Sequence, residues 1–154
     1  MAEDFKFIDP GALVDGDLTL ALLRTVPADP AKGYVPSYEF EMRFAQDGQA
    51  MGNLRLRIGD VDTLFYAGHV AYVVRAAFRG RRYAARGLRL VMPLASAHGL
   101  SKLWIGCDPN NVASRRTCEL LGAHLFETVD VPESHEICRR EGVHMICRYW
   151  IDLE

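Results

Sequence analysis

The amino-acid sequence predicts a protein of the α/β (α+β) class, in which a mixed, mostly antiparallel sheet is flanked by helices. Three observations support this class. Apolar and polar residues alternate in two runs of the first half of the chain, as they do in half-buried strands. Two stretches with helical spacing follow, each after a strand-like run, and two more strand-like runs come near the end. The 154 residues suit one domain, which we assign to residues 1–154.

The two alternating runs predict a hairpin. Every second residue is apolar in residues 38–44 and again in residues 53–58. Keeping both apolar sets on one face requires paired residue numbers to have an even sum, and a sum of 96 would pair Glu41 with Arg55. A further strand is expected before the hairpin, at residues 18–24.

The next run, residues 64–74, is largely apolar on both faces and predicts a central strand that is covered on both sides. Gly68 interrupts this run, and His69 follows it. A glycine in such a strand marks a bulge, a close approach by a ligand, or a simple packing requirement. The sequence leaves these three explanations open.

The second half of the chain predicts two helices between strands. Apolar residues recur at helical spacing over residues 83–98, with Gly99 as a C-terminal cap and Pro93 as the cause of a kink. The other expected elements are a strand at residues 103–107, a helix at residues 111–121, and strands at residues 124–131 and 143–153.

Composition and termini exclude several classes of protein. The first residues are acidic, and no apolar run is long enough for a membrane span, so we expect a cytoplasmic protein without a signal peptide. Four cysteines without an export signal indicate reduced thiols. Cys138, His144 and Cys147 lack a fourth ligand at a standard spacing, so no metal is expected.

Positive charge is concentrated in one segment, although the net charge of the chain is −2. Six arginines and no acidic residue lie within residues 75–89: Arg75, Arg79, Arg81, Arg82, Arg86 and Arg89. A basic segment on a mildly acidic protein favours a compact anionic ligand. Nucleic acid is the weakest alternative, because Phe78 and Tyr83 are the only aromatic residues there that could stack on bases.

The turn before the first predicted helix is suited to phosphate binding. Its sequence is Arg-Gly-Arg-Arg-Tyr-Ala at residues 79–84, where helix N-terminal amides and guanidinium groups would lie together. With Asn111 and Ser114 at the start of the next helix and Leu-Gly-Ala at residues 121–123, this pattern resembles the GNAT superfamily of N-acetyltransferases.

The resemblance implies acetyl-CoA as the cosubstrate and an amine of a small molecule or a peptide as the acceptor. From the charge, apolar-run and spacing arguments above, we expect no nucleic acid, membrane or metal. Exposed terminal strands also make a homodimer possible. The residues expected to bind acetyl-CoA are Val73, Val74, Arg79, Gly80, Arg81, Arg82, Tyr83, Ala84, Asn111 and Ser114.

Two departures from the family pattern stand out. Arg82 occupies the position of the central glycine of the family's phosphate-binding turn. The family usually has two helices between its first two strands, whereas residues 26–37 here form a proline-rich stretch that predicts only a loop. The acceptor side of the site must therefore be built differently.

The resemblance also implies catalytic roles. A backbone amide near Val74 would stabilise the oxyanion. Many relatives protonate the leaving thiolate with a tyrosine seven residues after the helix asparagine, and that position is Cys118 here. A cysteine with a pKa near 8.5 could donate this proton, or it could be a plain core residue. His69 is the best candidate for the general base, although a hydrogen-bonded core histidine is the more common finding in a strand.

Three functions thus remain in competition. The leading hypothesis is transfer of an acetyl group from acetyl-CoA to a primary amine by direct attack. The second is a catalytically inactive CoA-binding module of the same fold, because neither the acid nor the base is secure. The third, a nucleic-acid contact surface, ranks last.

Overall fold

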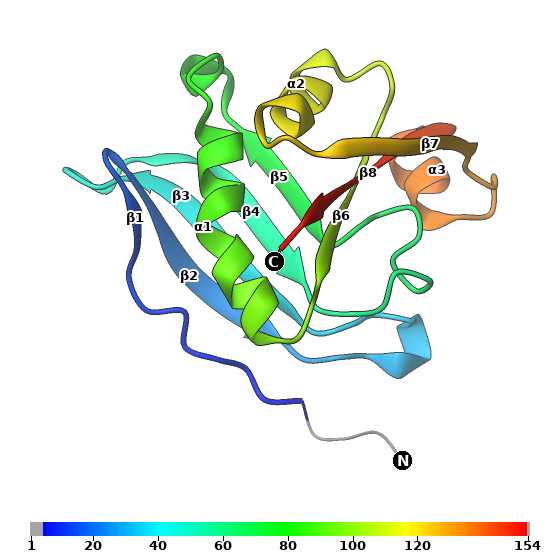
Figure 1. Cartoon of the computed structure of the whole chain (residues 1–154), viewed down its shortest axis with the longest axis horizontal. Helices are drawn as coiled ribbons and strands as arrows, with labels where there is room; N and C mark the ends of the chain where they lie inside the picture. Colours follow the sequence, from blue (N-terminus) through cyan, green and yellow to red (C-terminus); the bar gives the residue numbers. More distant parts are fainter. Residues whose placement is uncertain (1–4, 154) are drawn as a thin grey trace.

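The computed structural model describes residues 5–153, which form two antiparallel sheets and three α-helices (Figure 1). The first sheet contains, in spatial order, β1 (Leu13–Asp15), β2 (Leu18–Val26), β3 (Ser37–Phe44), β4 (Ala50–Arg57) and β5 (Val70–Val74). The second contains β6 (Lys102–Cys107), β8 (Met145–Asp152) and β7 (His124–Asp130), with β8 in the middle. The predicted fold class is confirmed.

The helices confirm both predictions from periodicity. They are α1 (Tyr83–Ala97), α2 (Val112–Leu120) and the short α3 (Glu136–Glu141), which we did not predict. Between β2 and β3 the chain forms only the 3₁₀ turn η1 (Pro30–Lys32), so the expected loop replaces the family's two helices. No helix within residues 5–153 is long and apolar enough to cross a membrane.

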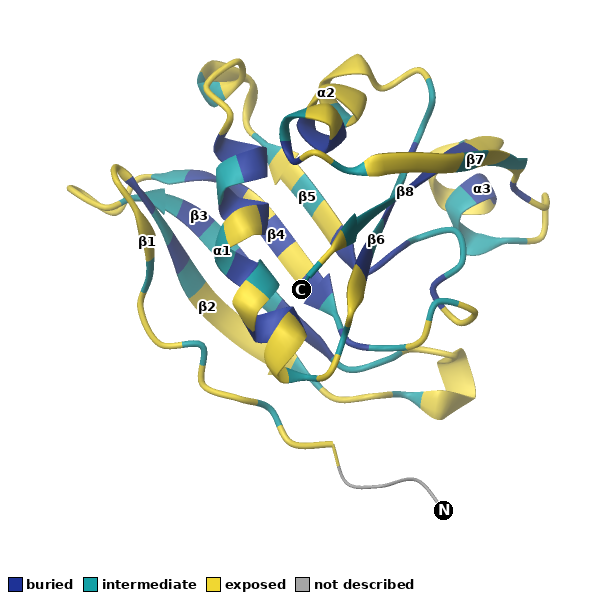
Figure 2. Cartoon of the chain, viewed as in Figure 1, coloured by how far each residue is buried: buried dark blue, intermediate teal, exposed yellow. Residues whose placement is uncertain are grey.

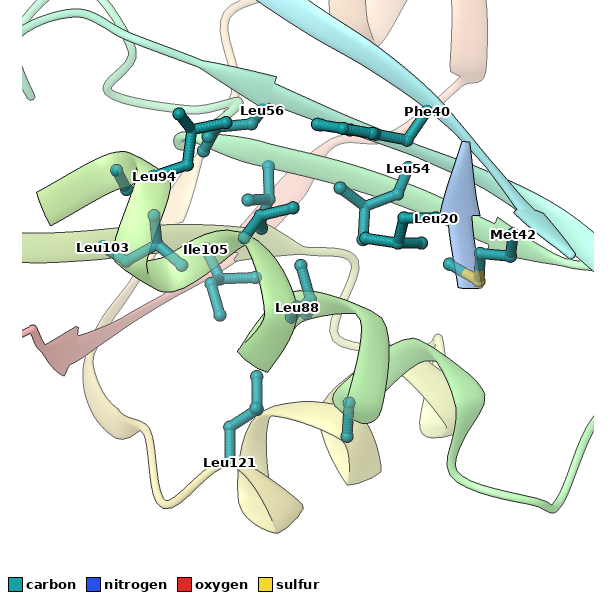
Figure 3. Close-up of a cluster of buried hydrophobic side chains, with 14 of the residues drawn as sticks. Leu20, Phe40, Met42, Leu54, Leu56, Leu88, Leu94, Leu103, Ile105 and Leu121 are labelled. Carbon is teal, nitrogen blue, oxygen red and sulfur yellow. The ribbon is translucent and has the colours of Figure 1, made fainter. Parts of the chain in front are cut away.

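Helix α1 packs on one face of the first sheet and forms the centre of the core (Figure 3). Leu88 and Leu94 of α1 lie among side chains from both sheets. Gly87 permits the close approach, because a Cβ atom there would lie 3.3 Å from the Leu54 side chain. Buried and more exposed residues alternate along β3 and β4 (Figure 2), which indicates that the face opposite α1 is the exposed one.

The predicted hairpin forms between β3 and β4, with its register shifted by two residues. Glu39 pairs with Arg55 and Glu41 with Asn53, so the paired numbers sum to 94 rather than 96. The sum remains even, which keeps both apolar sets on the α1 side. A bulge at Met51 takes the sum from 93 beside the turn, where Arg43 pairs with Ala50, to 94 along the strands, and so restores the even value.

The predicted strand at residues 64–74 is shorter than expected, and the prediction that it is central and covered on both sides is wrong, because β5 is the last strand of its sheet and Val73 is exposed. Strand β5 begins at Val70, because residues 61–67 form turns that start when the Asp60 carboxylate accepts a hydrogen bond from the Thr63 amide. Gly68 then adopts φ +71°, and it forms an isolated bridge with Ile105 of β6. A Cβ atom at Gly68 would lie 2.6 Å from the carbonyl oxygen of Trp104, so close packing explains this glycine.

Candidate functional site

A cleft of about 580 Å³ lies between the end of β5, the turn before α1, and helix α2. Nine of the ten residues predicted to bind acetyl-CoA line this cleft; Arg81 does not. The remaining lining residues are Tyr72, Phe78, Ala113, Arg116, Thr117 and Leu120. Since these residues come from three separate segments, the fold itself assembles the cleft that the sequence pattern indicated.

The turn before α1 holds Arg82 in an unusual backbone conformation. Arg82 adopts the left-handed conformation, with φ 65° and ψ 20°, directly before the first residue of the helix. It is the only non-glycine residue with positive φ in the described part of the chain. Glycine adopts this conformation without cost, whereas Arg82 does not. The turn places Tyr83 and Ala84, the first residues of α1, on the cleft, and the first amides of a helix have no partner within the helix.

Acidic partners or carbonyl groups hold several of the clustered arginines. Arg86 forms ion pairs with Asp15 and Asp17, both at 2.8 Å, and Arg89 donates to the carbonyl of Leu120. Arg79 and Arg82 line the cleft, together with Arg116 on the α2 side. No aspartate or glutamate is among its lining residues, so the cleft carries net positive charge.

The outer edge of β5 is available to a ligand. β5 is the last strand of its sheet. The Arg75 amide donates to the Met51 carbonyl, and the Arg57 amide donates to the His69 carbonyl, so the odd-numbered residues of β5 direct their backbone groups toward β4. Tyr72 and Val74 consequently turn their backbone N–H and C=O groups away from β4. The Val74 carbonyl accepts from Arg79 Nε at 3.0 Å, which holds the turn against this edge.

Asn111 caps helix α2 and also lines the cleft. Its side-chain oxygen accepts from the Ser114 amide at 3.0 Å. Ser114 in turn uses its hydroxyl to contact Tyr72, with 2.7 Å between Oγ and Oη. The start of α2 is thereby tied to β5 across the cleft.

Cys118 lies behind the cleft wall. Its side chain is 0% exposed, and it contacts the Cys107 thiol and the Tyr72 hydroxyl. Hydrogen bonding to Cys107 and burial raise the pKa of the Cys118 thiol, so the group stays protonated. The structure brings Cys118 close to the predicted site without giving it a surface on the cleft.

His69 lies outside the cleft, where the two sheets meet. The residue is 2% exposed, and its Nε2 lies 2.9 Å from the carbonyl oxygen of Gly59. Its Nδ1 accepts a hydrogen bond of 2.9 Å from the Trp104 amide, which makes Nε2 the protonated nitrogen. Burial lowers the pKa of His69. Neither nitrogen is available to an incoming amine, so this arrangement does not favour the predicted role as a base.

A second cleft, of about 630 Å³, lies on the open face of the first sheet. Glu39 lies there between Arg24 and Arg55, its neighbours on the adjacent strands, and forms an ion pair with each. Hydrogen bonding to Arg24 holds the pKa of Glu39 below its ordinary value. This cleft shares Tyr72 and Val73 with the first one, so the two adjoin at β5.

Sequence reasoning missed Tyr72 as a lining residue and missed the second cleft. Tyr72 lies in an apolar run in which nothing distinguishes a cleft residue from a core residue. The second cleft is built from four strands, and no local pattern records their pairing. Arg116 could have been found from the sequence, because Arg115 and Arg116 are consecutive on the predicted second helix and one of them could bind a phosphate of CoA.

The comparisons with known proteins agree with this geometry. The family profile described as an acetyltransferase (GNAT) domain matches residues 17–124. A structure of RimL, a ribosomal L7/L12 alpha-N-protein acetyltransferase in complex with coenzyme A, aligns with a TM-score of 0.66 and 15% identity over 92% of this chain and 97% of that one. The ribosomal-protein-S5-alanine acetyltransferase from Vibrio fischeri aligns with a TM-score of 0.60 and 16% identity over 77% and 62% of the two chains.

A third structure, the Microcin C7 self-immunity acetyltransferase in complex with acetyl-CoA and AMP, gives a TM-score of 0.58 and 16% identity over 75% of this chain and 61% of that one. The chain thus spans less than two thirds of some of these proteins, and at such identities the likeness shows the fold alone. No curated protein matches the sequence. The family profile covers well over half of the chain, and the chain therefore belongs to the GNAT acetyltransferase family.

Proposed function

We propose that this protein is an N-acetyltransferase that transfers the acetyl group of acetyl-CoA to a primary amine of a small molecule or a peptide. One observation carries the proposal: a positively charged cleft along the free edge of β5 adjoins a second cleft at Tyr72 and Val73. A donor on one side of the strand and an acceptor on the other would then meet at the same residues.

The donor side fits the chemistry of acetyl-CoA. The amides at the start of α1, with Arg79 and Arg82, offer donors and charge to the pyrophosphate. Arg116 lies on the α2 side of the cleft, where it could bind a further phosphate. The outward-facing amide of Val74, which is nearer to this turn, can pair with an amide group of the pantetheine arm.

The transfer needs a neutral amine, an oxyanion donor and a proton for the leaving sulfur. We assign the oxyanion to the outward-facing amide of Tyr72, which lies farther from the phosphate-binding turn than Val74. The amine enters through the second cleft, and with both His69 nitrogens engaged, its proton passes to solvent. Apolar surface around this cleft includes Leu23 and Val73, which are 49% and 63% exposed and suit an acceptor with an apolar portion.

Thermal shift with CoA tests the donor site. Saturating CoA should raise the melting temperature, because it binds only the folded chain, and Arg79→Glu with Arg82→Glu should abolish most of that increase. The matched control is Lys32→Glu with Arg139→Glu, which makes the same change in net charge at exposed positions outside the cleft. An equal shift in both double variants would remove the cleft from consideration.

The acceptor is found by measuring the release of free CoA from acetyl-CoA with a panel of amines. The panel contains amino sugars, polyamines, amino acids, aminoglycosides and peptides with free N-termini. Peptides merit inclusion because RimL, which shares the fold, is a ribosomal-protein acetyltransferase.

The second candidate is a CoA-binding module without catalysis. The closed environments of His69 and Cys118 favour it, because neither of these predicted catalytic groups lines the cleft. Tight CoA binding with no turnover of any amine in the panel would support this candidate over the transferase.

A further inference from the structure

We propose that Tyr72 donates the proton to the departing thiolate, so that the acid comes from strand β5 rather than from helix α2. This inference rests on the proposed transferase function. It concerns a tyrosine that the family pattern does not assign, in a chain whose residue at the family's tyrosine position is Cys118.

The position of Tyr72 supports the assignment. Tyr72 and Val73 line both clefts, and the Tyr72 side chain lies on the α1 side of β5, opposite Leu54 in the register. This side chain extends from β5 to the start of α2, where Oη lies 2.7 Å from Ser114 Oγ. The hydroxyl therefore lies between the free edge of β5 and the helix, on the path assigned to the pantetheine arm.

The surroundings of Cys118 explain how a tyrosine on β5 can replace one at position 118. The Tyr72 hydroxyl contacts the Cys118 thiol, so the phenol reaches from β5 the region that a tyrosine at position 118 would approach from α2. Cys118 itself is 0% exposed and does not line the cleft. A small residue at position 118 leaves room for the Tyr72 ring.

The protonation state of Tyr72 suits a donor. Burial and the neighbouring thiols of Cys118 on α2 and Cys107 on β6 raise its pKa, so the hydroxyl keeps its proton at and above neutral pH. The Ser114 hydroxyl, which can both donate and accept, offers a route by which the phenol regains a proton.

Acetyl transfer moves one proton from Tyr72 to the leaving sulfur. The amine nitrogen forms a bond to the thioester carbonyl carbon and releases one proton to solvent. The C–S bond then breaks, its electron pair goes to sulfur, and the Tyr72 hydroxyl proton passes to that sulfur to give the free thiol. The phenolate recovers one proton from solvent, so the enzyme returns unchanged and the net products are the amide and CoA.

Equilibrium binding tests the contact without an acceptor. Calorimetry compares CoA with desulfo-CoA, which lacks the sulfur, at pH 9.5, where part of the CoA is thiolate. Wild-type protein should prefer CoA on the order of tenfold, and Tyr72→Phe should lose this preference while binding desulfo-CoA as before, because a hydrogen bond to a charged atom contributes about this much. Tyr34→Phe makes the same change outside both clefts and should keep the preference.

The binding results distinguish a failure of the transferase function from a failure of the Tyr72 assignment. If wild-type protein binds neither ligand, the transferase function itself fails. If it binds both and Tyr72→Phe retains the wild-type preference for CoA, or if wild-type protein has no preference, the assignment of Tyr72 is wrong and the donor site stands.

Kinetics with an amine from the panel supply the second readout. Tyr72→Phe should lower kcat on the order of 10²-fold or more and leave KM for acetyl-CoA within about threefold, because protonation helps only in the transition state. Replacing Tyr72 with 3,5-difluorotyrosine, an acidic and nearly isosteric analogue, should add a falling limb to the pH profile at high pH, which a structural role would not produce. A loss of kcat in Cys118→Ala with full activity in Tyr72→Phe would overturn the proposal in favour of the thiol.

Discussion

At the scale of single residues, His69 makes the stability of the protein depend on pH. Its ring is neutral in the folded chain, with both nitrogens bonded, and burial lowers its pKa below the ordinary value near 6.5. The unfolded chain therefore binds a proton more readily as the pH falls. The stabilisation from a neutral His69 is complete above about pH 6.5 and is lost as the pH falls toward the lower pKa of the folded state.

We expect the melting temperature to fall between about pH 6.5 and pH 5, and His69→Gln to flatten this dependence. Part of the slope should remain, because burial also lowers the pKa of His98. Thermal denaturation followed by circular dichroism across this range measures the effect. His124→Gln changes an exposed histidine on β7 and serves as the control. Equal slopes for wild-type and His69→Gln protein would contradict the account.

Arg82 offers a test of backbone strain. Its left-handed conformation costs a non-glycine residue about 1–2 kcal/mol, whereas glycine adopts it freely. Arg82→Gly should therefore be more stable than Arg82→Ala by about 1 kcal/mol in urea unfolding. Both variants lack the guanidinium and should weaken CoA binding to a similar extent. Equal stabilities would mean that the turn relaxes when its side chain is removed.

At the scale of elements, the start of α2 has in Asn111 a cap that also lines the proposed donor cleft. Asn111→Ala removes the cap and should lower the free energy of unfolding by about 1 kcal/mol. Asn111→Asp keeps an oxygen for the Ser114 amide and should preserve stability, but it places a negative charge in the donor cleft. Urea unfolding and CoA titration together should thus separate the two roles. Unchanged CoA affinity in Asn111→Asp would leave Asn111 as a cap only.

Local sequence patterns predicted the longer helices and the hairpin but missed the short elements. Helical and alternating periods predicted α1, α2 and the hairpin, because each of these elements has one face against the core. They missed β1 and α3, which are short, and they extended β5 by several residues. Residues 64–67 are apolar and pack beside the second sheet while forming turns, and an apolar run does not distinguish that arrangement from a strand.

At the scale of the whole molecule, Gly68 determines how closely the two sheets approach. Gly68→Ala places a methyl group 2.6 Å from the Trp104 carbonyl and also strains a backbone with φ +71°. We expect a loss of about 2–3 kcal/mol of stability and weaker CoA binding, because the gap beside β5 would widen. Unfolding and CoA titration measure both effects.

Gly122→Ala is the matched control for Gly68→Ala. Gly122 has φ +73° with nothing within 4 Å of its Cβ position, so the substitution carries the same backbone strain without the clash. It should lose only about 1 kcal/mol and keep its CoA affinity. If the two variants behave alike, contact between the sheets does not control the width of the gap.

The parts of the site that consist of consecutive residues could be predicted from the sequence, and the parts that depend on long-range contacts could not. The turn at residues 79–84 and the cap at Asn111 carry their chemistry in consecutive residues, and the structure brings them together in one cleft. The positions of His69 and Cys118 depend on contacts from Trp104, Gly59 and Cys107, which no spacing in the sequence records. On the acceptor side, residues 26–37 predicted a loop in place of helices, but the second cleft depends on the pairing of four strands, which no local pattern records.

The free edge of β5 has a consequence for the protein without its donor. Unpaired N–H and C=O groups along a sheet edge can pair with any extended chain, which is how edge strands cause aggregation. In the proposed complex, a pantetheine arm along this edge would act as a temporary extra strand, and the amide hydrogens of Tyr72 and Val74 would exchange with solvent more slowly. Storage without CoA would leave this edge open to other chains, so we expect a CoA-free preparation to aggregate sooner.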